Sequence, residues 1–204
     1  HILFISGPPG IGKTSVGQAI AKEVNLPHFD LDQELEQSHN KTISELIQEG
    51  GWLEFRRKES IALESLVSKL STLKESNLTD LGRPTPMIVI SLGGGTVLSV
   101  TNCERMVDQG LILTLWGSER LISDRLKRRQ SLNQSTHLLP IDHLSDLPWL
   151  LVERRAAYLQ CDLWLEVYDG EASQQIADRV LKAWRGYIQA SELNKVIPKW
   201  FSPP

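Results

Sequence analysis

One stretch near the start of the chain, GPPGIGKT at residues 7–14, constrains the fold more than any other part of the sequence. It matches the pattern G-x-x-x-x-G-K-[ST] of a phosphate-binding loop (Walker A motif), and it lies between an apolar run at residues 2–5 and a helix-like segment at 15–24. A strand, a glycine-rich loop and a helix in this order direct backbone N–H groups and a helix N-terminus at one anion. We expect Lys13 to contact the β- and γ-phosphates of a nucleotide and Thr14 to bind Mg²⁺. The residues predicted to bind the nucleotide here are Gly7, Pro8, Pro9, Gly10, Ile11, Gly12, Lys13, Thr14 and Ser15.

Short apolar runs alternate with longer amphipathic stretches along the rest of the chain. This alternation is typical of βαβ units, so the pattern predicts an α/β fold with a parallel sheet. Strands are predicted at residues 2–6, 27–29, 87–92, 111–116 and 163–167. Helices are predicted at residues 15–24, 31–38, 43–48, 52–70, 103–108, 119–127, 147–159 and 173–187, with the pair Gly50-Gly51 separating the third from the fourth.

Composition places few further limits on the chain. Its 204 residues suit one domain, and 41% hydrophobic with 23% charged residues is ordinary for a soluble protein. A net charge of −3 gives no sign of nucleic-acid binding, and no apolar run approaches the ~20 residues that span a bilayer. Cys103 and Cys161 form no metal motif, which favours a reducing compartment. We expect a cytoplasmic protein, monomeric or part of a longer chain, or an organellar one if a targeting segment upstream of His1 was removed.

Three segments lack a clear periodic pattern. Residues 71–86 are expected to form a surface loop before a strand. Residues 128–146 are polar and irregular, and they are expected to form either a mobile lid or a plain surface connection. Residues 188–204 are expected to form a C-terminal tail, with Trp200 and Phe201 packing back on a domain that comprises residues 1–187.

Two carboxylates follow the second predicted strand in the sequence FDLD. Asp30 and Asp32 would lie at the carboxyl edge of the sheet, where ligands bind in α/β proteins. One of them is expected to hold Mg²⁺, and the other to accept a proton from a substrate hydroxyl. The alternative is that Asp30 only caps the helix that begins at Leu31.

Three consecutive glycines, Gly93, Gly94 and Gly95, follow the third predicted strand. Glycines at a strand end allow close approach of a ligand to the backbone, whereas a tight turn would explain only one of them. We therefore favour contact with a ligand.

Pairs of arginines occur on two predicted helices. On the helix after Trp52, Arg56 and Arg57 would point about 100° apart, so at most one faces a site and the other is solvated. Without further context, a surface ion pair between Arg56 and Glu59 is the preferred interpretation. Arg154 and Arg155 raise the same question.

Arg125 lies near the end of another predicted helix, in the sequence RLKRR. Adenine could stack on its guanidinium; the alternative is one more solvated charge.

The order and spacing of these motifs resemble the shikimate kinase family. The matching elements run from residue 2 to about 167: GPPGIGKT, FDLDQELEQ, ISELIQEGGWLEFRRKE, VISLGGG and the R-x-x-x-Y of Arg154 and Tyr158. The resemblance implies a nucleoside-monophosphate-kinase-like fold with three layers, a five-stranded parallel sheet and a closing lid. It also implies transfer of a phosphoryl group from Mg-ATP to the 3-hydroxyl of shikimate, a step of aromatic amino acid biosynthesis.

The resemblance also implies roles for single residues. Catalysis falls to Lys13 and Asp32, and the magnesium ligands are Thr14 and Asp30. The adenine-side arginine is Arg125. Shikimate is bound by Asp32, Arg56, Gly93, Gly94, Gly95 and Arg154, with the two arginines gripping its carboxylate.

The chain departs from the family pattern in the predicted lid. Family members have an arginine in a motif R-P-L-L that contacts the transferring phosphate, whereas this chain has QSTHLLP with Thr136 and His137 there. Loss of that cation would lower the rate by about 10³ or more, judged from arginine fingers. Arg128 or Arg129 could substitute, and His137 only when protonated. The sequence thus leaves two alternatives to an efficient shikimate kinase: a catalytically impaired ligand-binding or regulatory module, and a kinase of another acceptor such as gluconate.

Overall fold

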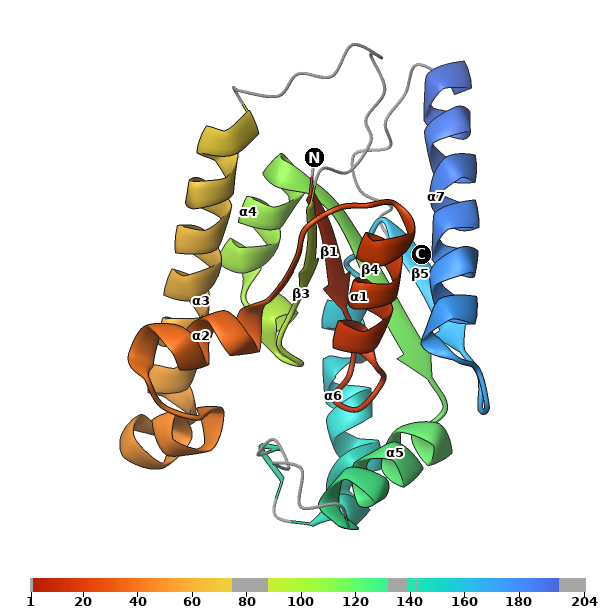
Figure 1. Cartoon of the computed structure of the whole chain (residues 1–204). Coiled ribbons are helices and arrows are strands. Elements are labelled where there is room, and N and C mark those ends of the chain that lie inside the picture. The colour runs from red at the N-terminus through yellow and green to blue at the C-terminus, as the bar shows by residue number, and fades with distance from the viewer. Residues whose placement is uncertain (1, 75–87, 132–138, 142, 195–204) are drawn as a thin grey trace.

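The computed structural model describes residues 2–74, 88–131, 139–141 and 143–194. In the helix that ends at residue 74 the side chains are described up to residue 70, and in the helix that ends at residue 194 up to residue 186. Figure 1 shows a central sheet with helices packed on both of its faces. Among the described residues no helix is long and apolar enough to cross a membrane.

All five predicted strands are present and form one parallel sheet. Each strand pairs in parallel with its neighbour, in the spatial order β2-β3-β1-β4-β5. The middle strand β1 is entirely buried, which explains its unbroken apolar sequence, because a parallel strand in mid-sheet is covered on both faces. The predicted α/β fold is confirmed. The strands are β1 (Ile2–Ser6), β2 (His28–Asp30), β3 (Ile88–Ser91), β4 (Gly110–Gly117) and β5 (Leu163–Val167).

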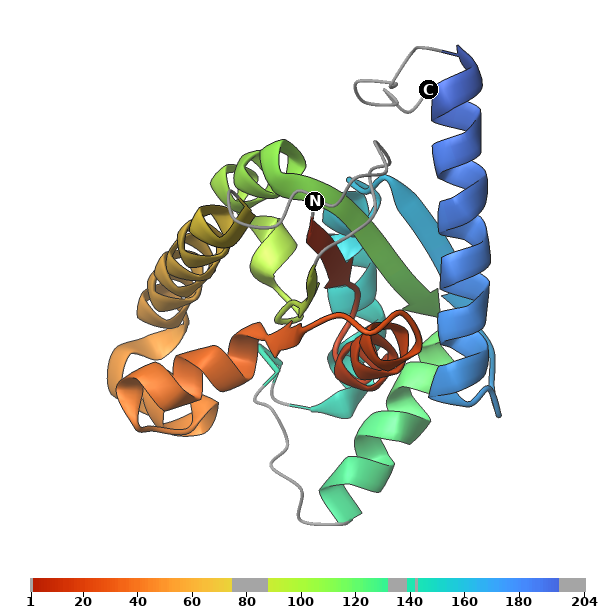
Figure 2. The ribbon, with the colours of Figure 1, turned by 45° about the horizontal axis from the view of Figure 1, so that its top comes forward.

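Successive side chains of the strands build two cores on opposite faces of the sheet. Leu3 and Ile5 of β1 pack in one core with α1 (Lys13–Glu23) and the start of α7 (Ser173–Asn194). Ile2 and Phe4 pack in the other with α3 (Ile43–Lys74) and α4 (Val100–Gln109). Figure 2 shows α1 and α7 on one side of the sheet and α3 and α4 on the other. The three layers predicted from the family resemblance are therefore confirmed.

A third, smaller core lies beside the sheet, where α2 (Leu31–His39) meets the first part of α3. Leu35, Ile43 and Phe55 are buried in it. This core holds the beginning of α3 against α2, next to the carboxyl edge of β2. The predicted break at Gly51 is confirmed, because this residue has φ 69° and ψ 177° inside the long helical stretch. Two helical segments therefore meet there at a bend.

Several element ends differ from the prediction. The helix α3 continues to Lys74, into the expected surface loop, and α7 continues to Asn194 where a tail was expected after Tyr187. The helix α5 (Glu119–Ser131) continues into the expected lid, and a short 3₁₀ turn (Leu144–Asp146) precedes α6 (Leu147–Tyr158). Residues with a high intrinsic helix propensity, such as Ala, Glu and Leu, can continue a helix where the sequence has no periodic apolar stripe. Trp200 and Phe201 lie outside the described residues.

The carboxyl ends of three adjacent strands meet at one edge of the sheet. The phosphate loop follows β1, the pair Asp30 and Asp32 spans the end of β2, and the glycine triplet follows β3. Since β1 and β2 both pair with β3, these three segments are neighbours in space. Ligands of open α/β sheets bind at such an edge.

Candidate active site

The phosphate loop ends at a helix N-terminus whose backbone N–H groups have no side-chain cap. Gly12 is the N-cap of α1 with φ 104°, a left-handed conformation that favours glycine, and no acidic residue lies in the first turn. The Lys13 ammonium donates to the carbonyl oxygens of Gly7 (3.0 Å) and Pro8 (3.2 Å), so it folds back over the loop. Uncapped N–H groups and a lysine on one concavity form an anion site.

Asp30 has two functions at once. Its Oδ1 accepts from the backbone N–H groups of Asp32 (3.0 Å) and Gln33 (3.2 Å), so it does cap α2. Its Oδ2 accepts from the Thr14 hydroxyl at 2.6 Å, which links the end of β2 to the phosphate loop. The cap therefore orients a carboxylate oxygen toward the loop, and the two interpretations of Asp30 are compatible. A carboxylate and a hydroxyl suit Mg²⁺, which combines few protein ligands with phosphates and water.

Asp32 lies in a pocket together with Lys13, Arg56 and Arg154, here called the central pocket. Burial, together with the nearby carboxylates of Asp30 and Glu59, raises the pKa of Asp32 to about 7 against the opposing charges of Lys13 and Arg56. Burial likewise lowers the pKa of Lys13 to about 8, although Asp32 and Asp30 oppose the change. A carboxyl group that titrates near neutral pH is suited to accept a proton.

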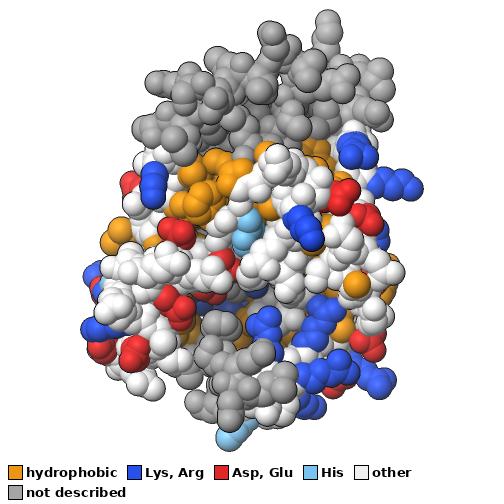
Figure 3. Space-filling view, viewed as in Figure 1, with side chains coloured by type: hydrophobic (Ala, Val, Ile, Leu, Met, Phe, Trp, Pro, Cys, Tyr) orange, Lys and Arg blue, Asp and Glu red, His pale blue; other side chains and the backbone are white. Residues whose placement is uncertain are grey.

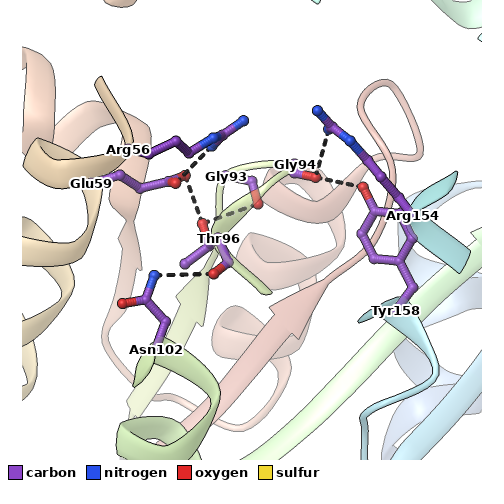
Figure 4. A network of polar contacts seen from close by, with 8 residues as sticks. All are labelled: Arg56, Glu59, Gly93, Gly94, Thr96, Asn102, Arg154 and Tyr158. Atoms are coloured by element: carbon purple, nitrogen blue, oxygen red, sulfur yellow. Dashed lines mark hydrogen bonds and ion pairs between the residues drawn. The ribbon is translucent and has the colours of Figure 1, made fainter. Parts of the chain in front are cut away.

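Glu59 anchors Arg56 from inside the protein. The Glu59 side chain is 1% exposed; its Oε2 accepts from Arg56 Nη1 at 2.6 Å and its Oε1 from the Thr96 hydroxyl at 2.7 Å. Asn102 donates to the Thr96 carbonyl at 3.0 Å and extends the network to α4 (Figure 4). The ion pair expected between Arg56 and Glu59 is therefore confirmed, whereas its expected position on the surface is wrong, because tertiary packing buries the carboxylate. The expectation for the adjacent arginine is confirmed, since Arg57 is 71% exposed.

Two aromatic rings support Arg56 from its other side. The guanidinium carbon lies 5.4 Å from the ring centroid of Trp52 and 5.1 Å from that of Phe55, and these rings meet edge to face. Cation–π contacts and the ion pair to Glu59 together limit the rotamers of Arg56. Its side chain is 27% exposed, so one face of the guanidinium stays accessible in the central pocket.

Arg154 enters the central pocket from the opposite side. It is buried on α6, and its Nη1 donates to the Gly94 carbonyl at 3.3 Å, which also accepts from the Tyr158 hydroxyl at 2.5 Å. The neighbouring Arg155 is exposed. Figure 4 shows Arg56 from α3 and Arg154 from α6 approaching the same space over Gly93 and Gly94. Two guanidiniums that converge in this way can bind a carboxylate by charge-assisted hydrogen bonds.

Lack of space for a side chain, and not a positive φ, explains the glycine triplet. None of its three residues has a positive φ. A Cβ on Gly93 would meet the carboxylates of Glu59 and Asp32, and one on Gly95 would meet the Arg56 guanidinium. A Cβ on Gly94 would lie 2.9 Å from Cγ of Pro9 in the phosphate loop. The alternative of a tight turn that needs positive φ is therefore wrong, and the triplet allows polar side chains and the phosphate loop to approach the backbone.

Arg125 lies on α5 beside the phosphate loop, outside the central pocket. Its Nη1 donates to the Ile11 carbonyl at 2.6 Å, and it lines a second pocket with Gly12, Ser15 and Glu171, here called the side pocket. Figure 3 shows basic side chains gathered over this helix. The position beside the loop suits the base or sugar of a nucleotide whose phosphates occupy the loop.

The central pocket therefore brings together most of the residues singled out in the sequence. Thr136 and His137 of the predicted lid lie outside the described residues. Sequence reasoning missed Thr96, which directly follows the glycine triplet, and the role of Trp52. Within the described ranges, no group of three or more His, Cys, Asp or Glu side chains could hold a metal by itself. The residues that line the central pocket from the predicted set are Pro9, Gly10, Gly12, Lys13, Thr14, Asp32, Arg56, Gly93, Gly94, Gly95 and Arg154.

A parallel sheet with a phosphate loop after β1 and a charged acceptor pocket beside it defines a phosphate-loop kinase of small molecules. Comparison with known proteins leads to the same class of protein. The family model described as shikimate kinase matches residues 9–185. Shikimate kinase 2 of Photorhabdus laumondii subsp. laumondii is 31% identical over 161 residues, which cover 79% of this chain and 83% of that protein. Shikimate kinase 2 of Pectobacterium carotovorum is 29% identical over 186 residues, covering 91% and 96%.

Solved structures show the same fold. The shikimate kinase from Acinetobacter baumannii in complex with shikimate superposes with a TM-score of 0.74 at 24% identity, covering 91% of this chain and 93% of that one. The chain belongs to the shikimate kinase family. The resemblance deduced from the sequence motifs is therefore confirmed.

Proposed function

We propose that this protein transfers the γ-phosphoryl group of ATP to the 3-hydroxyl of shikimate. The observation that carries the proposal is the pair Arg56 and Arg154, which approach one space from opposite sides of the central pocket, beside Lys13 and Asp32. Two arginines next to a phosphate loop suit an acceptor that has a carboxylate at one end and a hydroxyl at the other. Shikimate has both groups.

The acceptor's carboxylate is bound by the two arginines in this proposal. Guanidinium groups are planar and bind carboxylates through two parallel hydrogen bonds, which fixes the orientation of the ring as well as its position. Glu59 and the Gly94 carbonyl hold the arginines before substrate arrives. Because the side chains are already ordered, binding the acceptor costs less conformational entropy. The backbone of Gly93, Gly94 and Gly95 lines the pocket between them.

Asp32 is positioned to act on the hydroxyl that receives the phosphoryl group. With a pKa of about 7, a substantial fraction of Asp32 is ionised at neutral pH and can accept the hydroxyl proton. The hydroxyl oxygen then forms a bond to the γ-phosphorus, the bond to the β–γ bridging oxygen breaks, and ADP leaves. Lys13 and the N–H groups of the loop balance the negative charge of the phosphates.

The nucleotide occupies the phosphate loop and the side pocket in this proposal. Arg125 contacts the adenine side, because it borders the side pocket and is held to the loop by its bond to Ile11. Thr14 and Asp30 would hold Mg²⁺ with the phosphates. When bound, the ion supplies charge neutralisation on the phosphate oxygens.

Two other functions were open from the sequence. A catalytically impaired binding module is not favoured, since the family model and the curated relatives reported above are shikimate kinases. A different acceptor such as gluconate also has a carboxylate, and a gluconokinase from Sinorhizobium meliloti shares the fold with a TM-score of 0.52 at 16% identity. That likeness concerns the fold alone. The two converging arginines together with family membership favour shikimate.

A coupled ADP-release assay tests the proposal. Purified protein with Mg-ATP should release ADP rapidly with shikimate and only slowly with gluconate or without an acceptor. Lys13→Met should abolish the shikimate-dependent rate while leaving thermal unfolding cooperative. An ADP-release rate that does not depend on shikimate would contradict the proposal.

A further inference from the structure

A second arginine of α5 lies where the two pockets meet. Arg129 lines the central pocket together with Lys13 and Asp32, and it also lines the side pocket together with Arg125. Its neighbour Arg128 lines the side pocket but is not among the residues of the central one. The junction between nucleotide space and acceptor space is the region that a phosphoryl group crosses during transfer.

The position of Arg129 follows from the packing of α5 against the phosphate loop. Leu126 packs against Gly10 so closely that a Cβ on this glycine would lie 3.1 Å from Leu126 Cγ. Arg125 Nη1 donates to the Ile11 carbonyl at 2.6 Å. Both contacts hold the helix against the loop. Arg129 follows Arg125 by four residues and therefore lies on the same face of the helix, about one turn (~5.4 Å) further along.

Arg129 also has no carboxylate partner at ion-pair distance in the part of the chain that the structure describes, although Asp32 and Glu171 line the two pockets that it borders. It makes no hydrogen bond or ion pair with another described residue, whereas Arg56 and Arg179 both pair with carboxylates at 2.6 Å. Its charge instead acts on other cations: it contributes to lowering the pKa of Lys13, for which burial is the main cause, and that of Arg125. A half-buried guanidinium close to two other cations is stabilised by an anion.

We propose that Arg129 is a catalytic residue that binds the phosphoryl group during its transfer from nucleotide to acceptor. The proposal rests on the kinase function proposed above. It gives this chain a cation for the transferring phosphate on a helix, whereas the stretch that contains Thr136 and His137 has none. A guanidinium can contact two equatorial oxygens of the phosphoryl group, whose charge is greatest as the bonds change.

The test compares Arg129→Met with Lys127→Met, which removes one positive charge from an exposed position on the same helix that lines neither pocket. Turnover with saturating Mg-ATP and shikimate should fall by about 10²–10³ in Arg129→Met, with the shikimate KM changed by less than about threefold. Lys127→Met should keep turnover within about threefold. Arg129→Lys should recover part of the rate, because it restores the charge without the planar fork.

Calorimetric titration with ADP and with a non-hydrolysable ATP analogue provides a second measurement, which does not require turnover. Arg129→Met should weaken binding of the analogue about tenfold and leave ADP within about twofold, since only the analogue has a γ-phosphate. Equal weakening of both ligands, unchanged turnover, or an equal loss in Lys127→Met would overturn the role. If the wild-type protein did not phosphorylate shikimate, the proposed function would fail, whereas the titrations would still test the contact of Arg129 with the γ-phosphate.

Discussion

Replacement of Asp32 by Asn should abolish catalysis and at the same time stabilise the free protein. The Asp32 carboxyl group is confined in the central pocket near the carboxylates of Asp30 and Glu59, and burial is the main cause that raises its pKa. Asn has nearly the same shape and carries no charge. The substitution therefore removes an ionisation that folding opposes, together with the group proposed to accept the substrate proton.

The expected size of the effect follows from the pKa. A pKa raised from 3.8 to about 7 costs the folded state roughly 4 kcal/mol once Asp32 is ionised in both folded and unfolded protein. Between pH 5 and 7 the folded protein keeps a proton that the unfolded chain has lost. The wild type should therefore lose roughly 2 kcal/mol relative to Asp32→Asn over these two pH units, less than the full 1.36 kcal/mol for each because half of Asp32 is ionised at pH 7. Above about pH 8 the difference should be constant.

Urea unfolding of wild type and Asp32→Asn at pH 5, 6, 7 and 8 without ligands measures this difference. For a chain of this length, each 1 kcal/mol corresponds to roughly 2–4 °C in melting temperature, so thermal scans give a second reading. Asp108→Asn, at an exposed position on α4, is the matched control and should show no such pH-dependent gain. A variant no more stable than wild type at pH 8, or a difference independent of pH, would refute the reasoning.

Three further predictions concern the same site. The ratio kcat/KM for shikimate, which reports on the free enzyme, should rise with pH up to about 7, where Asp32 ionises. It should fall above about pH 8, where Lys13 loses its proton. A flat profile from pH 6 to 9 would contradict both assignments. Arg154→Lys should raise the shikimate KM by roughly 10- to 100-fold, because a bidentate contact is lost, while calorimetry shows ATP affinity within about twofold; an equal loss of ATP affinity would place the residue elsewhere. Gly94→Ala should lower the unfolding free energy by about 1–3 kcal/mol in urea titrations, since its Cβ would lie 2.9 Å from Pro9; an unchanged midpoint would show that the loop moves freely.

Much of the fold follows from local sequence patterns. The phosphate loop, its preceding strand and its following helix are adjacent in sequence, so one motif predicts all three. Parallel strands buried on both faces have continuous apolar sequences, which is why β1 and β3 could be found without a structure. The carboxyl ends of parallel strands share one edge of the sheet, so the sequence predicts that Asp30 and the glycine triplet lie close together.

Contacts between distant segments could not be predicted in the same way. The spacing of Arg56 and Glu59 predicts an ion pair but not its burial, which depends on Thr96 from the segment after β3. Arg128 and Arg129 are likewise equivalent in sequence, but only Arg129 lines the central pocket. Which of them reaches the central pocket is determined by the packing of α5 on the phosphate loop, and no local pattern encodes that contact.

The identity of the phosphorylated product shows which hydroxyl of the acceptor receives the phosphoryl group. The protein should be incubated with Mg-ATP and shikimate, and the product examined by two-dimensional NMR that correlates ³¹P with ¹H. We expect one new phosphate monoester whose phosphorus couples to the proton at carbon 3 of the shikimate ring, formed in equal amount to ADP. A phosphate on another hydroxyl, or ADP without a phosphorylated ring, would contradict it.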